Sequence, residues 1–148
     1  MGCVAHTQTE DIVVGRGLDN RVNLWSAASG SYLRSFDETL NGIVCVAASA
    51  DGNTAAAGAK SGWLRVWDVR SGDCRMSLVA HTGGMATVAC SPEGKFVMTG
   101  PLGYWGPIAK LWSVCNGHCI ASFKGHTDSI QCLAFSPNGL RVASGSAD

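Results

Sequence analysis

The chain has 148 residues, enough for one domain with a single core, and its eleven basic and eleven acidic residues give a net charge of zero. Without a basic excess, the composition argues against a nucleic-acid-binding face or a polybasic membrane-binding face. No apolar run reaches the roughly 18 residues that a membrane-spanning helix needs. Seven cysteines, with no C-x-x-C pair, argue against a disulfide framework and favour a reducing, intracellular compartment, cytoplasmic or nuclear.

An internal repeat runs along the chain. Three tryptophans in similar surroundings recur at spacings of 42 and 45 residues, namely Trp25, Trp67 and Trp112. Turns of the form Ser-x-x-Gly follow short apolar runs in the same register, which supports the repeat. The predicted units are 1–36, 42–79, 84–123 and a half unit, 129–148.

Each unit divides into short strands separated by turns. The first unit begins inside its first strand, at Cys3–Ala5, and the second unit has four segments between Asp-Gly and Ser-Gly turns: Ile43–Ala48, Thr54–Ala59, Trp63–Val69 and Cys74–Val79. The first of these four is apolar on both faces, which predicts burial on both sides, whereas the third alternates, as a half-buried strand does. Four-stranded units at this period predict an all-β chain of propeller blades.

The recurring motifs resemble those of the WD-repeat β-propeller family over essentially the whole chain. They are the Gly-His pair at 125–126, the Ser-Pro-x-Gly turns, Ser-Gly-Ser-x-Asp at 144–148 and the Trp-Asp pair at 67–68. The resemblance implies a β-propeller segment of four-stranded antiparallel blades, about three and a half of them, in a ring that this chain alone does not close.

In that family, a His, a Ser or Thr, an Asp and the Trp of one repeat form a hydrogen-bonded tetrad. Such a chain satisfies buried N–H groups and fixes the geometry of a blade. No repeat here holds all four members; the third has Gly103 in place of the Asp. We expect Trp67 and Trp112 to be buried. The resemblance assigns the tetrad positions to Asp19, Trp25, Trp67, His81, Thr99, Trp112, His126, Ser144 and Asp148.

The sequence offers little that points to catalysis or to a cofactor. Cys115, His118 and Cys119 could be zinc ligands, but a tight turn between strands explains them better because no second ligand cluster accompanies them. The Ser, His and Asp of the tetrad recur at repeat positions, which favours a scaffolding role over a catalytic triad. We therefore expect no catalytic residue, no metal and no cofactor, and hence no enzyme.

Two loops on one rim of the predicted propeller are unusual. The third unit has three extra residues within 100–107, and Trp63 begins a third strand where the family most often has Thr. Aromatic side chains presented on a rigid frame are common anchors of protein interfaces. The predicted partner-binding residues on this rim are Arg16, Lys60, Trp63, Tyr104, Trp105 and Asp128.

The interpretation that follows is a non-catalytic protein–protein interaction scaffold that binds a protein or peptide, within a larger complex, through its rim loops. One alternative is a reader of a modified peptide, with Trp63, Tyr104 and Trp105 as a partial aromatic cage. Another is a propeller enzyme with a site in the central channel, which the apolar first strands disfavour. No direct contact with nucleic acid or membrane is expected.

Three and a half blades would leave an open arc, since propellers close with roughly four to eight. We therefore expect the chain to be a fragment of a longer protein or an incomplete gene model, with the rest of the ring supplied by further sequence. An open arc would expose Val142 on an unpaired strand edge, so the chain alone is expected to aggregate.

Overall fold

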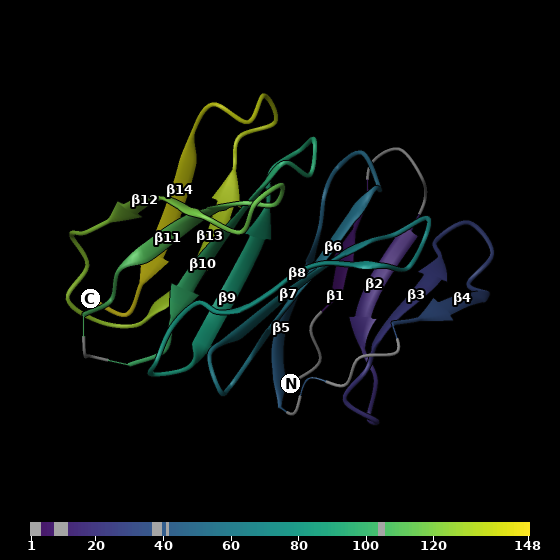
Figure 1. The fold of residues 1–148 in the computed structure, drawn as a ribbon, viewed down its shortest axis with the longest axis horizontal. Coiled ribbons are helices and arrows are strands. Elements are labelled where there is room, and N and C mark those ends of the chain that lie inside the picture. Colours follow the sequence, from purple (N-terminus) through teal and green to yellow (C-terminus); the bar gives the residue numbers. More distant parts are fainter. Residues whose placement is uncertain (1–3, 8–11, 37–39, 41, 104–105) are drawn as a thin grey trace.

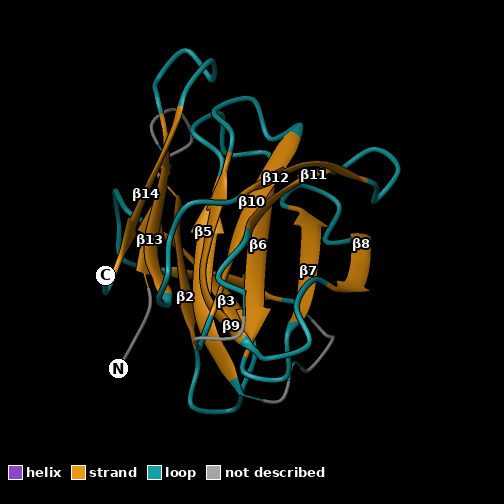
Figure 2. Ribbon diagram, turned by 90° about the vertical axis from the view of Figure 1, so that its left-hand side faces the viewer, coloured by secondary structure: helices purple, strands orange, loops and turns teal. Residues whose placement is uncertain are grey.

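The computed structural model describes residues 4–7, 12–36, 40, 42–103 and 106–148 of the chain. Within these residues the regular structure is entirely strand (Figure 2). The strands are β1 (Val4–His6), β2 (Ile12–Arg16), β3 (Val22–Ser26), β4 (Tyr32–Ser35), β5 (Ile43–Ala48), β6 (Thr54–Ala59), β7 (Trp63–Asp68), β8 (Cys74–Val79), β9 (Met85–Cys90), β10 (Phe96–Pro101), β11 (Ala109–Ser113), β12 (Cys119–Phe123), β13 (Ile130–Phe135) and β14 (Val142–Ser146).

The strands form blades in chain order. Three antiparallel sheets have the orders β1-β2-β3-β4, β5-β6-β7-β8 and β9-β10-β11-β12, and β13 pairs with β14 in a fourth, two-stranded sheet. We call them the first to fourth blades. The all-β prediction of three and a half blades in an unclosed arc is confirmed (Figure 1). The described residues include no helix with the length and hydrophobicity required to cross a bilayer.

The first strands of successive blades lie side by side. β1 contacts β5, β5 contacts β9, and β9 contacts β13, while the fourth strands β4, β8 and β12 form the opposite edges of their sheets. Residues of β6 are buried along its whole length, because the second blade is packed between the first and the third. This accounts for an Ala-rich strand, since small side chains let neighbouring sheets approach closely.

Three apolar clusters join the blades face to face, the third of them between the third and fourth blades around Met98 and Ile130. Between the first and second blades, Leu24 packs in one cluster with Ile43 and Trp67. Between the second and third blades, Leu64 and Met85 belong to the other cluster. The hydrophobic core therefore lies between the sheets, so each blade depends on its neighbours for burial.

Gly58 on β6 sets the approach of the second blade to the third. A Cβ atom at this position would lie 2.2 Å from Sδ of Met85 on β9 and 2.7 Å from Sγ of Cys45 on β5. Met85 is fully buried, so its thioether has little room to retreat. Glycine is therefore required here by packing against the next blade.

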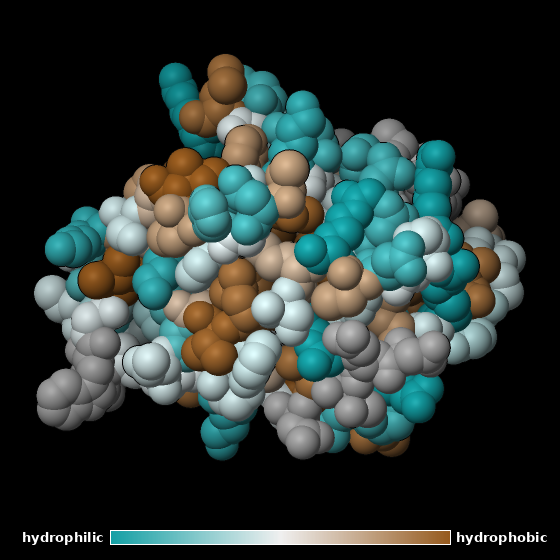
Figure 3. Space-filling view, viewed as in Figure 1, coloured by the Kyte–Doolittle hydropathy of each residue, from teal (hydrophilic) through white to brown (hydrophobic). Residues whose placement is uncertain are grey.

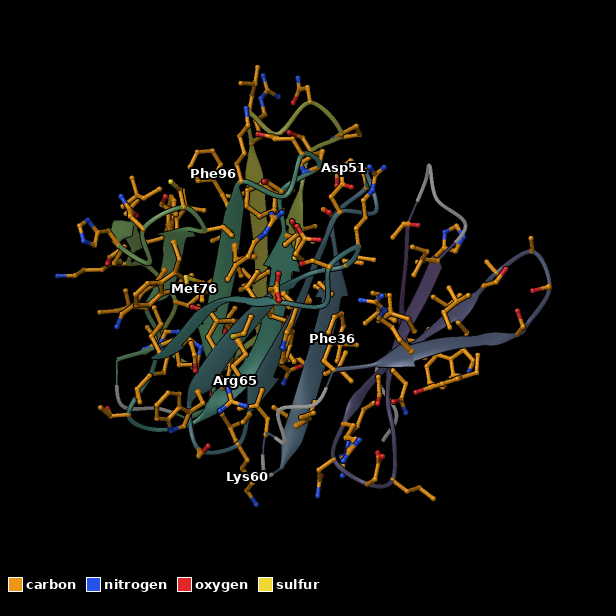
Figure 4. All side chains as sticks on the ribbon, turned by 45° about the vertical axis from the view of Figure 1, so that its right-hand side comes forward. Phe36, Asp51, Lys60, Arg65, Met76 and Phe96 are labelled. Atoms are coloured by element: carbon orange, nitrogen blue, oxygen red, sulfur yellow. The ribbon has the colours of Figure 1, made fainter. Side chains whose placement is uncertain are left out.

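The antiparallel order places the loops on two rims. The β2–β3, β6–β7 and β10–β11 loops share one rim with the linkers that precede β5, β9 and β13; we call this the linker rim. The remaining turns form the turn rim. Lys60 at the end of β6 lies on the linker rim, and Asp51 lies at the opposite end of the blade (Figure 4).

Hydrogen bonds join the linkers to the inter-strand loops along the linker rim. The backbone N–H of Ala80 donates to the carbonyl of Gly62 at 2.9 Å, and Leu102 N–H donates to Gly84 O at 3.1 Å. Gly103 N–H in turn donates to the hydroxyl of Ser129 at 2.8 Å. These bonds fix the β6–β7 loop and the start of the β10–β11 loop to the adjoining linkers.

We predict that Gly58→Ala lowers the free energy of unfolding by about 1–3 kcal/mol, because the added methyl overpacks the contact with Met85. Gly83→Ala is the matched control, since a Cβ there would meet only the carbonyl oxygen of Leu102 at an ordinary 3.6 Å. Urea unfolding of both variants measures the difference. Equal stability of the two variants would contradict the packing role of Gly58.

Candidate functional site

Three side chains of the third blade form a buried hydrogen-bonded chain. Thr99 on β10 accepts a hydrogen bond from the indole N–H of Trp112 on β11 at 2.9 Å. The same hydroxyl lies 2.9 Å from Nε2 of His81, which precedes β9. All three are buried, and His81 is only 7% exposed. Because buried ring N–H groups are costly without partners, this chain fixes the linker to its blade.

The surroundings of His81 keep its imidazole neutral. Burial first, and then the nearby charge of Lys110, lower the pKa of His81 from its ordinary value of 6.5 to about 4, while a hydrogen bond with the backbone of Thr99 opposes the shift. Lys110 on β11 donates from Nζ to the carbonyl of Ala80 at 2.9 Å and lies 5.6 Å from the ring centroid of Trp112. At neutral pH, the positive charge of this corner is therefore that of Lys110.

The fourth blade carries a related set in which a carboxylate is present. His126 Nε2 lies 2.9 Å from the hydroxyl of Ser144, and Nδ1 lies 3.0 Å from Asp148 Oδ1. Asp148 also accepts hydrogen bonds from the backbone N–H and the hydroxyl of Thr127. The Thr127 backbone bond first, and then His126, lower the pKa of Asp148 to about 2. A His–hydroxyl pair at the same spacing in two blades is thus a feature of the repeat.

The first and second blades use their tryptophans differently. Asp19 accepts a hydrogen bond from Arg21 N–H at 3.1 Å and pairs with the Arg21 guanidinium, so it stays within its own turn and does not bond the partly buried Trp25. Trp67 is buried as expected and stacks on Phe36, with ring centroids 4.9 Å apart and planes 16° apart. In the second blade, the tryptophan is therefore fixed by aromatic stacking on the first blade, whereas in the third blade it is fixed by a hydrogen bond.

The rim residues expected to bind a partner lie on successive blades. Arg16 ends β2, Lys60 follows β6, Trp63 begins β7, and Asp128 lies in the linker before β13. Trp63 is 40% exposed. Arg16 contacts Asn20 Oδ1 at 3.3 Å, and Asp128 accepts a hydrogen bond from Ser129 N–H at 2.5 Å.

The predicted aromatic cage includes residues that the structure does not describe. Tyr104 and Trp105 lie outside the described residues, so the cage stays a prediction.

The described residues hold no group of three or more His, Cys, Asp or Glu side chains placed to bind a metal. Cys115, His118 and Cys119 form an exposed turn, closed by a hydrogen bond from Ser113 N–H to His118 O at 2.9 Å.

Three of the four first strands carry no acid–base side chain. Along β5, β9 and β13 no Asp, Glu, His, Lys or Arg occurs, whereas β1 ends in His6. Burial first, and then the negative charge of Asp51, raise the pKa of Cys90 on β9 to about 12, so its thiol stays protonated and unreactive. A channel enzyme finds no support in these strands.

Two exposed apolar residues beside Trp63 were missed from the sequence. Val79, 49% exposed, is the cross-strand partner of Trp63, and Leu102, 46% exposed, follows β10. We call Trp63, Val79 and Leu102 the rim patch. Apolar residues are visible on the surface where the chain passes from β8 to β9 (Figure 3). The Cα pairing of Trp63 with Val79 is the signal that could have identified this patch, because cross-strand neighbours share a face.

A hollow of about 550 Å³ opens beside the rim patch. It lies between the β8–β9 linker and the β10–β11 loop. Both Val79 and Leu102 contribute to its wall, so the hollow and the rim patch form one continuous surface. We call it the His81 pocket; its walls include Val79, His81, Leu102, Gly103, Ile108 and Lys110.

Comparisons with known proteins agree with this repeat architecture. The family model described as "WD domain, G-beta repeat" matches residues 30–68, 72–113 and 117–148. Each match starts near the fourth strand of one blade and continues into the next blade, so the sequence repeat is offset from the sheet by one strand.

Several curated proteins are similar to parts of the chain. Autophagy-related protein 16 of Arabidopsis thaliana is 35% identical over 51% of the chain and 15% of its own length. Cilia- and flagella-associated protein 52 of Chlamydomonas reinhardtii is 26% identical over 65% of the chain and 16% of its own. Periodic tryptophan protein 2 homolog of Caenorhabditis elegans is 27% identical over 60% and 10%. The chain thus spans between a tenth and a sixth of these relatives.

We predict that Thr99→Val destabilises the protein by about 2–4 kcal/mol, because it leaves both His81 and Trp112 without their partner. Thr99→Ser is the matched control; it keeps the hydroxyl and loses one methyl group, at a cost of about 1 kcal/mol. Chemical unfolding at pH 7 compares them. If Val and Ser cost the same, the hydroxyl is not what stabilises the blade.

A second prediction concerns pH. The pKa of folded His81 is lowered to about 4, so between pH 6.5 and 4 the unfolded state binds a proton that the folded state does not, and stability falls as pH falls. The variant His81→Gln has no imidazole at this position and so loses this pH dependence. The stability advantage of the wild type over the variant should therefore shrink from pH 7 to pH 4 in urea unfolding. A constant difference over that range would contradict it.

Proposed function

The chain belongs to the WD-repeat family, and from that premise we propose that it acts as a non-catalytic scaffold that binds a partner protein on its linker rim, around Trp63. WD repeats generally serve as platforms for protein interaction, which is the coarse role that membership supports. In this chain, the proposed binding surface is the rim patch of Trp63, Val79 and Leu102. Arg16, Lys60 and Asp128 are polar residues on the same rim.

The observation that carries the proposal is the exposure of three large apolar side chains on one rim: Trp63 pairs with Val79 across the sheet, and Val79 and Leu102 share the wall of the His81 pocket. Isolated exposed apolar residues are ordinary on protein surfaces, but adjacent ones on fixed elements are typical of interfaces. The backbone of Trp63 is fixed by the pairing of β7 with β8, so binding would not have to order the strand that carries the ring. A hydrophobic anchor bordered by polar groups favours a protein partner.

The two-stranded sheet of the fourth blade is more exposed than the other sheets, which bears on how the arc is completed. Residues of β13 and β14 are largely exposed or half-exposed, in contrast with the buried β6 of the second blade. We propose that further strands complete this sheet within a longer protein, in a larger complex. The described cysteines form no disulfide with one another, and we propose a reducing, intracellular setting, cytoplasmic or nuclear.

We predict that Trp63→Ala weakens partner binding at least tenfold, as truncation of an aromatic hot spot does, while thermal stability changes little because the side chain is partly exposed. The experiment is quantitative affinity capture from cells with the tagged full-length protein, followed by titration of the captured partner. Leu140→Ala is the matched control, since Leu140 is 82% exposed in the β13–β14 turn on the opposite rim.

The two variants separate the possible outcomes. Equal capture by Trp63→Ala and the wild type would refute the rim patch as the binding surface. A parallel loss of melting temperature and binding in Trp63→Ala would show instead that Trp63 is a structural residue.

A further inference from the structure

The third and fourth blades carry the same His–hydroxyl pair but differ in the third member of the set. His81 and Thr99 are 18 residues apart, as are His126 and Ser144, and four residues later the fourth blade has Asp148 where the third has Gly103. In the fourth blade, the Asp148 carboxylate lies 3.0 Å from the Nδ1 atom of its histidine. The third blade therefore lacks the carboxylate that Asp148 provides in the fourth blade.

Among the described residues, the space beside Gly103 is open. Its φ is +105°, and a Cβ built there would meet no described atom within 4 Å, its chain neighbours aside. Gly103 and His81 both line the His81 pocket. Among the described residues, the side-chain hydrogen bond of His81 is made by Nε2, to the hydroxyl of Thr99, and no hydrogen bond joins Nδ1 to a described side chain. The imidazole thus lines the pocket with Nδ1 not engaged by a described side chain.

Lys110 adds an uncompensated positive charge. Its ammonium group donates to Ala80 O, which leaves two of its three N–H donors unused by that contact. The ion pairs of the described residues involve other cations, and none joins Lys110 to an Asp or Glu. A half-buried ammonium group without a carboxylate favours an anionic ligand, because the charge is only partly solvated.

We propose that the His81 pocket binds a carboxylate side chain, Asp or Glu, of the partner protein, with Lys110 pairing its charge and His81 Nδ1–H donating a hydrogen bond. This inference rests on the proposed function, since the pocket adjoins the rim patch. The partner's acid takes the role that Asp148 has in the fourth blade. Val79, Leu102 and Ile108 on the pocket wall suit apolar residues on either side of that acid.

A single negative charge fits better than a phosphate. The described wall contains one lysine and no arginine, and the imidazole is neutral at pH 7. Phosphate recognition commonly uses arginine forks or several cations, because the group carries nearly two charges. One ammonium group and one N–H donor match the charge and the two oxygens of a carboxylate.

The test is an NMR titration of the isotope-labelled protein with three probes: the tripeptide Ac-Leu-Glu-Leu-NH₂, its Gln counterpart and inorganic phosphate. We expect the Glu peptide to bind in the millimolar range, to shift the His81 ring resonances and to raise the pKa of His81, because a carboxylate stabilises the imidazolium. The Gln peptide should bind at least about tenfold more weakly, since it loses a charge-assisted hydrogen bond.

Lys110→Met should weaken the Glu peptide about tenfold or more and leave the Gln peptide unchanged. Lys95→Met, at an exposed lysine in the β9–β10 turn of the opposite rim, is the matched control and should bind as the wild type does. The indole N–H resonance of Trp112 reports that the blade remains folded in each variant.

Equal binding of the Glu and Gln peptides to the wild type would overturn the carboxylate proposal without relying on any variant. Stronger binding of phosphate, or no effect of Lys110→Met in a folded blade, would overturn it as well. None of these results bears on the dependence of partner capture on Trp63, so a failure here is distinguishable from a failure of the proposed function.

Discussion

Each blade of this protein has two apolar faces, and the requirement to cover both governs the rest of the structure. The Ala-rich β6 is buried along its length because sheets press on it from both sides. Gly58 shows how tight the contact is, since even one methyl group would overlap Met85 of the next blade. The identity of a small residue in one blade is therefore set by a side chain in another, and the packing of the core is a property of pairs of blades.

The same requirement explains why the repeat sequence can vary so much at its polar positions. The third blade joins His81 to Trp112 through one hydroxyl, whereas the second supports Trp67 by a stack with Phe36. The fourth blade uses a carboxylate on the far side of its histidine. Apolar burial supplies most of the stability, so several local solutions can fix a linker to its blade.

The strands could be predicted from the sequence because their signals are local and repeated. The expected segments Ile43–Ala48 and Thr54–Ala59 coincide with β5 and β6, since turn residues and alternating patterns mark strand ends directly. The rim patch was only partly foreseen. Trp63 stands out by residue type, but the exposure of Val79 depends on which residue it faces across the sheet. The pocket at His81 depends on an empty position next to Gly103, and the size of a void is set by tertiary packing.

The offset between repeat and sheet has a consequence for how such a chain can lengthen. The match at 72–113 contains β8, the outer strand of the second blade, together with β9, β10 and β11 of the third. A gene duplication of such a unit would deliver a strand that completes the sheet before it and three that found the next. New blades would then be attached by backbone hydrogen bonds from the moment of their origin, so the evolutionary module of this architecture is the junction between two blades.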